Sequence, residues 1–335
     1  MSIDRVRGSV IVPVYNNARD IGECLSALTA CSAFTTEIIV VDDASTDESP
    51  SVAASLGARV LRLPKNSGPS AARNYGARQA VGEILLFVDA DVLVMPSHID
   101  RLLTVLEEQP NIAAIFGSYD AEPRASGLIS GYRNLLHHFM HQNGNQEAST
   151  FWAGCGAIRR SVFEEIGGFD EKQFRHSSIE DIELGYRLRR AGYRILLDKR
   201  VQATHLKKWT LRSMISTDVS ARAVPWAKLI IQTKKAPDDL NLKRGQRLSV
   251  ALTGLAGVSL LFAPLRPELL HFSMAALIAI FFLNRKLYAF FFRQRGIFFA
   301  IRCIPLHLLY YLYSGSSYLF AWLDFQRRRL EDSAK

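Results

Sequence analysis

Two aspartates separated by one residue follow a short apolar run in this sequence. Asp89 and Asp91 come directly after Ile84–Val88, and such an uninterrupted run predicts a strand covered on both faces. The two carboxylates should then lie at the carboxyl end of the strand, the edge of an open α/β sheet where ligands bind. Their oxygens suit Mg²⁺ or Mn²⁺, which complete their coordination with water and substrate phosphates. Paired acids at a strand end are also often simply solvated, so this motif alone leaves both interpretations open.

Polar residues also follow the first two predicted strands. Ser9–Val14 leads into Tyr15, and Glu37–Val41 leads into Asp43. Because the carboxyl ends of neighbouring parallel strands meet over one crevice, these side chains should lie close together. A carboxylate there can accept from a base N–H or from ribose hydroxyls, and Tyr15 can flank the base. We expect Asp43 to bind ligand and Asp47 to serve mainly in the turn or as a helix cap.

A glycine-containing loop opens the helix expected at 69–81. Gly68 precedes Pro69 at the start of this helix, and Arg73 lies one turn further on. Free backbone N–H groups and a guanidinium can clamp a diphosphate, or the guanidinium can hold an aspartate such as Asp43 in place. The loop matches neither the dinucleotide-binding fingerprint nor the phosphate-loop pattern of nucleotide hydrolases.

The elements that must position these residues alternate between strand and helix from Ser9 to about Asp120. This alternation predicts an α/β fold with a parallel, doubly wound sheet. Further strands are expected at 59–63 and 112–117, and helices at 18–30, 48–56 and 98–108. Beyond a small apolar stretch at 152–158, the pattern predicts a helix at 180–191 and two short strands at 194–197 and 202–205.

Composition and charge divide the 335 residues unevenly. Residues 241–335 hold 13 Lys and Arg against 4 Asp and Glu, so they account for the whole formal net charge of +9. The basic residues alternate with long apolar runs, which favours a membrane surface over nucleic acid. The four cysteines show neither metal-ligand nor disulfide spacing, which indicates a reducing compartment. The N-terminus has no apolar stretch typical of a secretory signal, so none is expected.

The C-terminal part predicts membrane attachment. Residues 207–247 should form amphipathic interfacial helices, broken at Pro225, and a linker; packing of a helix on the first domain is the alternative. Apolar blocks at 248–264 and 269–283 are near the lower limit of about 17–25 residues for a span. A third block, 297–323, is long enough. Keeping all the basic clusters on the cytoplasmic side allows two spans, so the third block is re-entrant, interfacial or spanning.

Taken in order, the motifs resemble those of family-2 glycosyltransferases. The matching stretches include Val-Asp-Asp-Ala-Ser-Thr-Asp at 41–47, Asn-Ser-Gly-Pro-Ser-Ala-Ala-Arg-Asn at 66–74 and Phe-Val-Asp-Ala-Asp at 87–91. Further matches are Gly-Cys-Gly-Ala-Ile-Arg-Arg at 154–160, Ile-Gly-Gly-Phe-Asp-Glu at 166–171 and a Glu-Asp-Ile-Glu stretch at 180–183. The resemblance covers about residues 8–205 and implies the GT-A fold, a Rossmann-like sheet that binds a nucleotide-sugar donor.

The resemblance also implies an inverting displacement with a role for each matching residue. Asp181 would be the base that deprotonates the acceptor hydroxyl, with Glu180 beside it, although acids in a first helical turn are common for stability alone. A divalent ion, Mg²⁺ or Mn²⁺, would lie near Asp89, Asp91 and His205. Donor-nucleotide contacts are expected from Pro13, Tyr15, Asn16, Asp42, Asp43, Asn66, Arg73 and Asp89. Acceptor-side residues are expected to be Trp152, Gly154, Cys155 and Phe169.

One departure from the family bears on the product. The Gln-x-x-Arg-Trp signature of processive members has no counterpart after the Glu-Asp pair, so we expect transfer of one or a few sugars. We therefore predict a catalytic domain over 1–206, the interfacial segment over 207–247 and membrane-anchoring helices over 248–335. The enzyme would be an integral protein of the inner membrane with a cytoplasmic catalytic domain and a lipid-linked or membrane-proximal acceptor. The alternatives are a nucleotidyltransferase and a nucleotide-sugar-binding membrane scaffold.

Overall fold

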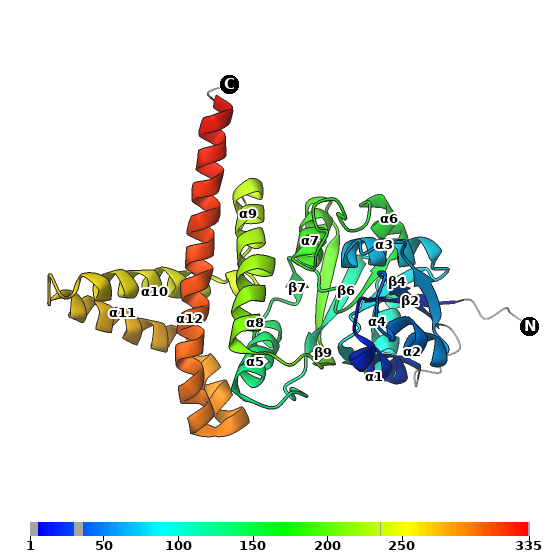
Figure 1. Ribbon diagram of the computed structural model, residues 1–335, viewed down its shortest axis with the longest axis horizontal. Helices are drawn as coiled ribbons and strands as arrows, with labels where there is room; N and C mark the ends of the chain where they lie inside the picture. Colours follow the sequence, from blue (N-terminus) through cyan, green and yellow to red (C-terminus); the bar gives the residue numbers. More distant parts are fainter. Residues whose placement is uncertain (1–5, 30–35, 235, 334–335) are drawn as a thin grey trace, which may run out of the picture. The chain divides into compact units, whose positions relative to one another are not determined.

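The computed structural model describes residues 6–29, 36–234 and 236–333. The chain divides into two compact units (Figure 1). The first contains the described residues up to Ala125 together with His141–Lys208. The second contains Ser126–Met140 and the described residues from Trp209 onward. Ala30 and Cys31, which the sequence analysis considered, lie outside the described residues.

The first unit is built on a mixed sheet with nine strands among the described residues. Its order is β3-β2-β1-β4-β8-β6-β9-β5, with β7 paired to β9. The strands are β1 (Gly8–Val14), β2 (Thr36–Asp42), β3 (Arg59–Arg62), β4 (Ile84–Val88), β5 (Val92–Val94), β6 (Ile112–Tyr119), β7 (Glu147–Ala148), β8 (Cys155–Arg159) and β9 (Arg194–His205).

The prediction of a wholly parallel sheet was wrong for the second half of this unit. β1, β2, β3 and β4 are parallel, as the strand–helix alternation indicated. β8, however, runs antiparallel to both β4 and β6, and β5 runs antiparallel to β9. The short strands β5, β7 and β8 gave no clear periodic signal. The two strands expected at 194–197 and 202–205 form the single strand β9.

Helices cover both faces of this sheet and explain the apolar runs of its central strands. The helices of the first unit are α1 (Ala18–Thr29), α2 (Ser49–Ser55), α3 (Pro69–Gln79), α4 (Pro96–Glu108), α6 (Arg160–Glu165) and α7 (Glu180–Arg190). α1, α2 and α4 pack in one core cluster with Val10, Val12 and Leu86. On the opposite face, Phe87 packs against Phe163 and Phe169. Burial on both faces is the reason that β1 and β4 read as continuous apolar runs.

The second unit is helical. It comprises most of α5 (Leu128–Gln142), then α8 (Leu211–Ser216), a π-helical segment (Thr217–Ala223), α9 (Val224–Thr233), the short 3₁₀ segment Leu240–Leu242, α10 (Arg244–Phe262), α11 (Leu269–Leu283) and α12 (Arg285–Ser333). The break predicted at Pro225 does not occur. The π-helical segment ends at Ala223, and Pro225 is the second residue of α9, where its missing N–H is tolerated while the helix continues.

The apolar blocks form helices α10, α11 and α12. α12 is bent at Arg295 and Gly296, whose backbone angles are not helical. Among the described residues, two helical stretches are long and apolar enough to cross a membrane, Arg244–Phe262 and Arg285–Glu331, while Leu269–Leu283 is apolar but shorter. Much of their apolar surface is exposed, which gives a weak indication of membrane association.

A buried polar cluster ties α5 to the later helices of the second unit. Asp218, in the π-helical segment, accepts hydrogen bonds from Arg133 of α5 and from Tyr313 of α12. Arg133 and Asp218 are both buried. Ser130 Oγ accepts from the Trp209 backbone N–H at 2.9 Å. Residues 126–140 therefore group with the C-terminal helices, whereas the sequence analysis placed them in a continuous first domain over 1–206.

Candidate active site

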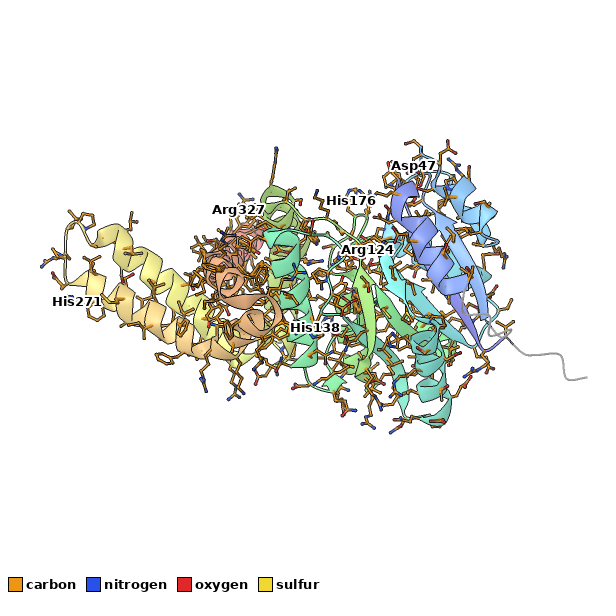
Figure 2. All side chains as sticks on the ribbon, turned by 90° about the horizontal axis from the view of Figure 1, so that it is seen from below. Asp47, Arg124, His138, His176, His271 and Arg327 are labelled. Carbon is orange, nitrogen blue, oxygen red and sulfur yellow. The ribbon has the colours of Figure 1, made fainter. Side chains whose placement is uncertain are left out.

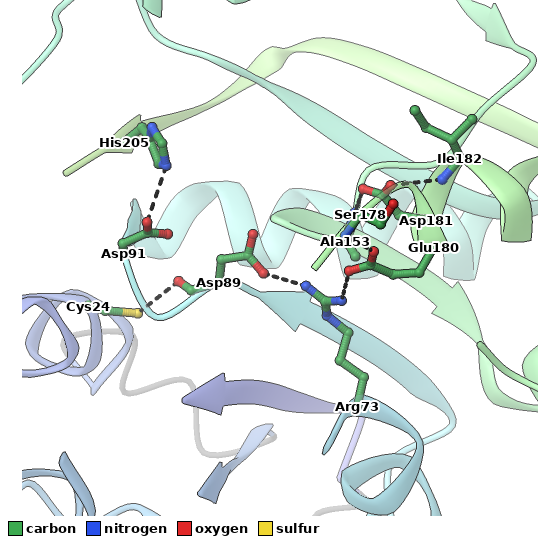
Figure 3. Close-up of polar contacts among 10 residues, drawn as sticks. All are labelled: Cys24, Arg73, Asp89, Asp91, Ala153, Ser178, Glu180, Asp181, Ile182 and His205. Atoms are coloured by element: carbon green, nitrogen blue, oxygen red, sulfur yellow. Dashed lines mark hydrogen bonds and ion pairs between the residues drawn. The ribbon is translucent and has the colours of Figure 1, made fainter. Parts of the chain in front are cut away.

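Asp91 and His205 meet at one edge of the sheet because of strand register. The turn that carries Asp89 and Asp91 joins β4 to β5, and in the pairing of β5 with β9, Val92 lies opposite His205. This register brings His205 Nε2 within 3.3 Å of Asp91 Oδ2 (Figure 3). Burial acts to raise the pKa of Asp91, but the hydrogen bond and charge of His205 outweigh burial and lower the pKa. Asp91 is therefore held ionised.

Arg73 links the turn that carries Asp89 and Asp91 (the D-x-D turn) to the Glu-Asp pair at 180–181. Its Nη2 lies 2.6 Å from Asp89 Oδ1 and its Nη1 lies 2.9 Å from Glu180 Oε1 (Figure 3). The Arg73 side chain is 5% exposed, so this bridge is shielded from solvent. Burial alone would lower the pKa of Arg73, but the two carboxylates raise it further above its ordinary value. Two motifs far apart in the sequence thus meet on one guanidinium.

Asp181 is the second residue of α7, and backbone N–H groups hold its carboxylate. Oδ1 accepts from the Ile182 N–H at 2.8 Å, and Oδ2 accepts from the Ala153 N–H at 3.2 Å. The residue remains partly exposed. Burial of the carboxyl group, and then the negative charge of Glu180, raise the pKa of Asp181 to about 7. A carboxylate with a pKa near neutrality is suited to accept a proton.

The loop before α3 is shaped by Asp43. The Asp43 oxygens accept from the backbone N–H groups of Ser67 at 2.7 Å and Gly68 at 2.8 Å. Asp43 is thus held by this loop, whereas Arg73, the residue considered as its partner, contacts Asp89 and Glu180. Tyr15 is 49% exposed and open to a ligand.

The other polar residues of this region fix its turns. Asn16 Oδ1 accepts from the Thr46 N–H at 2.8 Å, and Asp42 Oδ1 accepts from the Ser45 N–H at 2.9 Å. Asp47 accepts from the N–H groups of Ala18 and Ser49, in the structural role expected of it. Pro13 ends β1 beside them, and Asn66 is exposed on the loop before α3.

Helix α3 also fixes the segment that leads to the Glu-Asp pair. Asn74 Nδ2 donates to the Phe169 carbonyl at 2.8 Å, and Asn74 Oδ1 accepts from the Phe169 N–H at 2.9 Å. At the start of α3, Gly68 has φ of +91°, and a Cβ there would lie 2.0 Å from the Arg175 carbonyl oxygen. Only glycine fits both this backbone conformation and this approach.

Two residues predicted on the acceptor side belong to the core instead. Cys155 is fully buried, because in β8 it lies opposite Val88 of β4. Phe169 is 2% exposed and packs against Phe87 and Phe163. Neither can line a pocket in this arrangement. Burial raises the pKa of the Cys155 thiol to about 12, so this thiol is unreactive.

Trp152 and Gly154 lie beside Asp89 and His205, and their role on the acceptor side stays a prediction. Trp152 is half-buried and its ring centroid is 4.6 Å from that of Tyr119, which in turn is 5.0 Å from that of His205. A Cβ at Gly154 would lie within 2.7 Å of three atoms of the Trp152 ring, so the glycine permits this ring position. The Asp89 N–H donates to the Gly154 carbonyl at 3.3 Å.

The chemistry of these side chains suits a divalent cation. Asp89 and Asp91 keep 33% and 23% of their side-chain surface exposed, so both remain accessible. Carboxylate oxygens and an imidazole nitrogen are ligands that Mn²⁺ or Mg²⁺ accepts, with donor phosphates to complete the shell. Among the described residues no ready-made group of three His, Cys, Asp or Glu side chains occurs, because Asp89 is turned toward Arg73.

The sequence also matches a family model. The model described as glycosyl transferase family 2 matches residues 9–167, which include Asp43, Arg73, Asp89 and Asp91. Residues 9–167 belong to the family-2 glycosyltransferases. The chain is therefore an enzyme that acts on nucleotide-activated sugars, and its sheet has the GT-A fold.

The relatives with similar sequences are also glycosyltransferases. An uncharacterised glycosyltransferase of Haemophilus influenzae is 28% identical over 219 residues, with 63% of this chain and 72% of that protein covered. The pre-mycofactocin glycosyltransferase of Mycobacterium tuberculosis is 29% identical over 223 residues, with 62% of this chain and 44% of that protein covered. The match thus spans less than half of the mycobacterial relative.

Two solved structures share the fold. A mannosyltransferase from Pyrobaculum calidifontis, in complex with GDP-Man and Mn²⁺, superposes with a TM-score of 0.58 and 21% identity, covering 94% of this chain and 87% of that one. TarS 1–349 from S. aureus superposes with a TM-score of 0.52 and 20% identity, covering 96% and 91%.

Some residues that shape the site could not be assigned from the sequence. Asn74 was recognised as part of a motif but given no contact, and the backbone N–H of Ala153, which binds Asp181, has no side-chain signal at all. The bridge from Arg73 to Glu180 joins distant segments and follows only from the fold.

Proposed function

We propose that this glycosyltransferase transfers one or a few sugars from a nucleotide-diphosphate donor to an acceptor hydroxyl, with inversion at the anomeric carbon. The observation that carries the proposal is the bridge of Arg73 between Asp89 and Glu180. It joins the acids at the carboxyl end of β4, where a donor diphosphate would lie, to the segment that presents a base. The acids that would bind the cation and the proposed base would then lie in one site.

Asp181 is assigned as the base. Its ionised carboxylate would take the proton of the acceptor hydroxyl while the oxygen attacks the anomeric carbon and the bond to the nucleoside diphosphate breaks. The N–H groups of Ala153 and Ile182 fix the carboxylate, and Glu180 is turned away toward Arg73 and the Ser178 N–H. Glu180 therefore positions the site rather than exchanging the proton.

The donor is assigned to the carboxyl ends of β1, β2 and β4. The loop at Ser67 and Gly68, shaped by Asp43, and the exposed ring of Tyr15 would receive the nucleoside. Asp91 and His205, with the accessible oxygen of Asp89, would hold Mn²⁺ or Mg²⁺. A cation bound there would stabilise the charge that develops on the departing diphosphate.

The acceptor is proposed to be lipid-linked or membrane-proximal. The support is the exposed apolar surface of α10, α11 and α12 and the basic excess of the C-terminal third. Attachment of the enzyme to the membrane that carries the acceptor raises the effective concentration of both reactants. The glycosyltransferase domain would then work on the cytoplasmic face of the inner membrane.

The test is transfer or hydrolysis of nucleotide-sugars by the full chain purified in detergent, with a donor panel that includes GDP-mannose. We expect turnover with Mn²⁺ or Mg²⁺ and its loss with a chelator. Asp181→Asn should lower kcat by about 10²–10⁴-fold with donor affinity kept. The control is Glu171→Gln, which removes an exposed acid of the preceding segment.

Three results would contradict the proposal. Full activity of Asp181→Asn would refute the assignment of Asp181 as the base. Donor binding without turnover across the panel would favour a scaffold. Release of pyrophosphate from a nucleoside triphosphate and a sugar phosphate would favour a nucleotidyltransferase.

A further inference from the structure

One face of helix α12 is fixed by its contact with α10. The Tyr311 hydroxyl donates to Gln246 Oε1 at 2.7 Å. One turn further along, a Cβ at Gly315 would lie 3.0 Å from a Val250 methyl group, so the two helices approach closely there. Positions 311 and 315 of α12 therefore face the N-terminal end of α10.

Beyond α10 this face of α12 is exposed. By helical periodicity it runs from positions 311 and 315 through Tyr318, Leu319 and Trp322. These side chains are 46%, 55% and 42% exposed. A helix face that is apolar, aromatic and exposed next to a packed contact is typical of an interaction surface.

The hairpin formed by α10 and α11 is apolar on most of its outer surface. Both helices expose large apolar side chains along their length: Leu255, Val258, Leu261, Phe272, Met274, Ile278 and Phe282. Its contacts bury mainly small and polar residues along the seam, such as Ser249, Ala256, Ser273 and Ala276. Such a hairpin suits a hydrocarbon environment. The charges at its turn, Arg266 and Glu268, are exposed and 3.8 Å apart.

The hairpin and α12 do not run in the same direction. In Figure 1 the yellow hairpin extends crosswise from the orange and red α12. In Figure 2, turned by 90°, the hairpin again extends away while α12 is seen nearly end-on. If the hairpin enters a bilayer along the membrane normal, α12 must lie along the membrane surface.

The length of α12 supports this orientation. From Ile297 to Ser333 the helix continues without a further break, and at 1.5 Å per residue it is about 55 Å long. A bilayer is about 40–45 Å thick including its headgroups. A helix of this length that crossed along the membrane normal would exceed the bilayer thickness by about 10–15 Å.

We propose that the α10–α11 hairpin inserts into the bilayer, whereas α12 from Ile297 onward lies on the cytoplasmic leaflet and does not span. The inference rests on the membrane attachment proposed above and specifies which helices make it. It assigns the third apolar block to the interface, although its length and composition alone would allow a span.

The partner of this surface is an anionic lipid leaflet. Tyr318 and Trp322 are the aromatic types that prefer the headgroup boundary. Arg327, Arg328 and Arg329 follow them on the same helix and are exposed, so they can reach anionic phosphates. The hairpin enters the membrane from the side of α12 that bears these aromatic residues.

The test is the sidedness of the two ends of this helix. Gln294→Cys and Glu331→Cys place exposed cysteines at either end of the proposed interfacial segment. The three described cysteines are buried, so only Cys31 is replaced by serine in the background. A membrane-impermeant maleimide is applied to the full chain in inverted and in right-side-out membrane vesicles. We expect both cysteines to react in inverted vesicles and neither to react in right-side-out vesicles.

Labelling of the two ends from opposite sides would overturn the inference and leave membrane attachment standing. Release of the chain by a carbonate wash would instead refute the attachment itself. Leu265→Cys, at the exposed turn of the hairpin, should not react in inverted vesicles; its reaction there would also overturn the inference.

A depth measurement tests the face of α12 independently. Spin labels at Tyr318→Cys and Ser316→Cys are compared, because both positions are exposed and, two residues apart on one helix, they point to nearly opposite sides. We expect oxygen to relax the label at 318 more strongly, and a water-soluble nickel complex to relax the label at 316 more strongly. Equal water exposure of both labels, or a concentration-dependent dimer that shields 318, would refute the assignment to lipid.

Discussion

At the scale of single residues, Arg73 is the most constrained side chain of the site. Its two terminal nitrogens are each committed to a different carboxylate, at 2.6 Å from Asp89 and 2.9 Å from Glu180. Phe169 covers it, with the guanidinium carbon 5.4 Å from the ring centroid. A planar guanidinium can serve two acceptors in fixed directions, which an ammonium cannot do.

Replacement of Arg73 by lysine should therefore lower the rate while preserving the charge. A lysine can reach only one of the two carboxylates, so the other loses its partner in a buried site. We expect kcat to fall by about 10–100-fold, equivalent to about 1.4–2.7 kcal/mol. Arg78→Lys, an exposed position on the same helix, is the control and should leave kcat unchanged. A full-rate Arg73→Lys enzyme would show that the bridge is dispensable.

The pH dependence of transfer should report the raised pKa of Asp181. The base must be ionised, and burial and Glu180 raise the pKa of Asp181 to about 7, so kcat/KM should rise as the pH increases through neutrality. Glu180→Gln removes the neighbouring negative charge, which lowers the pKa of Asp181. The acidic limb of the profile should therefore move to lower pH. If the acidic limb of the kcat/KM profile does not shift in Glu180→Gln, a group other than Asp181 controls it.

At the scale of elements, helix α3 organises the site from one side. Through Gly68, Arg73 and Asn74 it contacts Asp43, the D-x-D turn and the segment before α7. All three of these segments are thus held by α3, a helix of 11 residues. Misplacement of its N-terminus should disturb the nucleotide loop first.

The substitution Gly68→Ala tests this dependence. It places a Cβ at positive φ and 2.0 Å from the Arg175 carbonyl oxygen. The backbone conformation alone should cost about 1–3 kcal/mol, and the overlap about 1–3 kcal/mol more. Gly57→Ala is the matched control, because Gly57 also has positive φ (+79°) but no atom within 4 Å of a Cβ. We expect both variants to melt earlier, and only Gly68→Ala to lose donor affinity. Equal losses in both would refute the role of the close approach.

The sequence was informative for long, periodic elements and uninformative for short ones. The apolar run of β4 and the helix that begins at Pro69 were predicted within about two residues, because both-face burial and Pro at a first turn leave direct signals. β8 was not predicted as an antiparallel strand, because pairing direction depends on segments far along the chain. For the same reason Asp91 and His205 could be proposed as neighbours only by resemblance, and Cys155 and Phe169 were misplaced on the acceptor side.

At the scale of the whole molecule, the two units are not consecutive in the sequence. Residues 126–140 belong to the helical unit although the chain on both sides belongs to the glycosyltransferase domain. Within the helical unit, Arg133 and Asp218 form a buried ion pair, and Tyr132 is fully buried. The helices after Trp209 therefore complete a unit that begins with α5.

A chain truncated after Lys208 should consequently be unstable. It would leave Arg133 without Asp218 and uncover the apolar residues of α5. Loss of one partner of a buried ion pair costs about 3–5 kcal/mol. We expect the truncated chain to aggregate or to melt well below the full chain in circular dichroism. Asp218→Asn in the full chain, which removes the charge but keeps the helices, should show a smaller loss. A soluble truncated chain with an unchanged melting temperature would contradict the division.

The same interleaving limits how this enzyme could be recombined with its relatives. A chimera that exchanges the donor-binding part for that of another transferase at a single junction would carry a foreign copy of α5 into the helical unit. Such a graft would have to preserve Arg133 and the small residue at Gly131, which leaves room for the Phe299 ring. We therefore expect a functional chimera to keep residues 126–140 of the enzyme that supplies the helical unit. Each exchange of the donor-binding part then needs two additional junctions in the sequence.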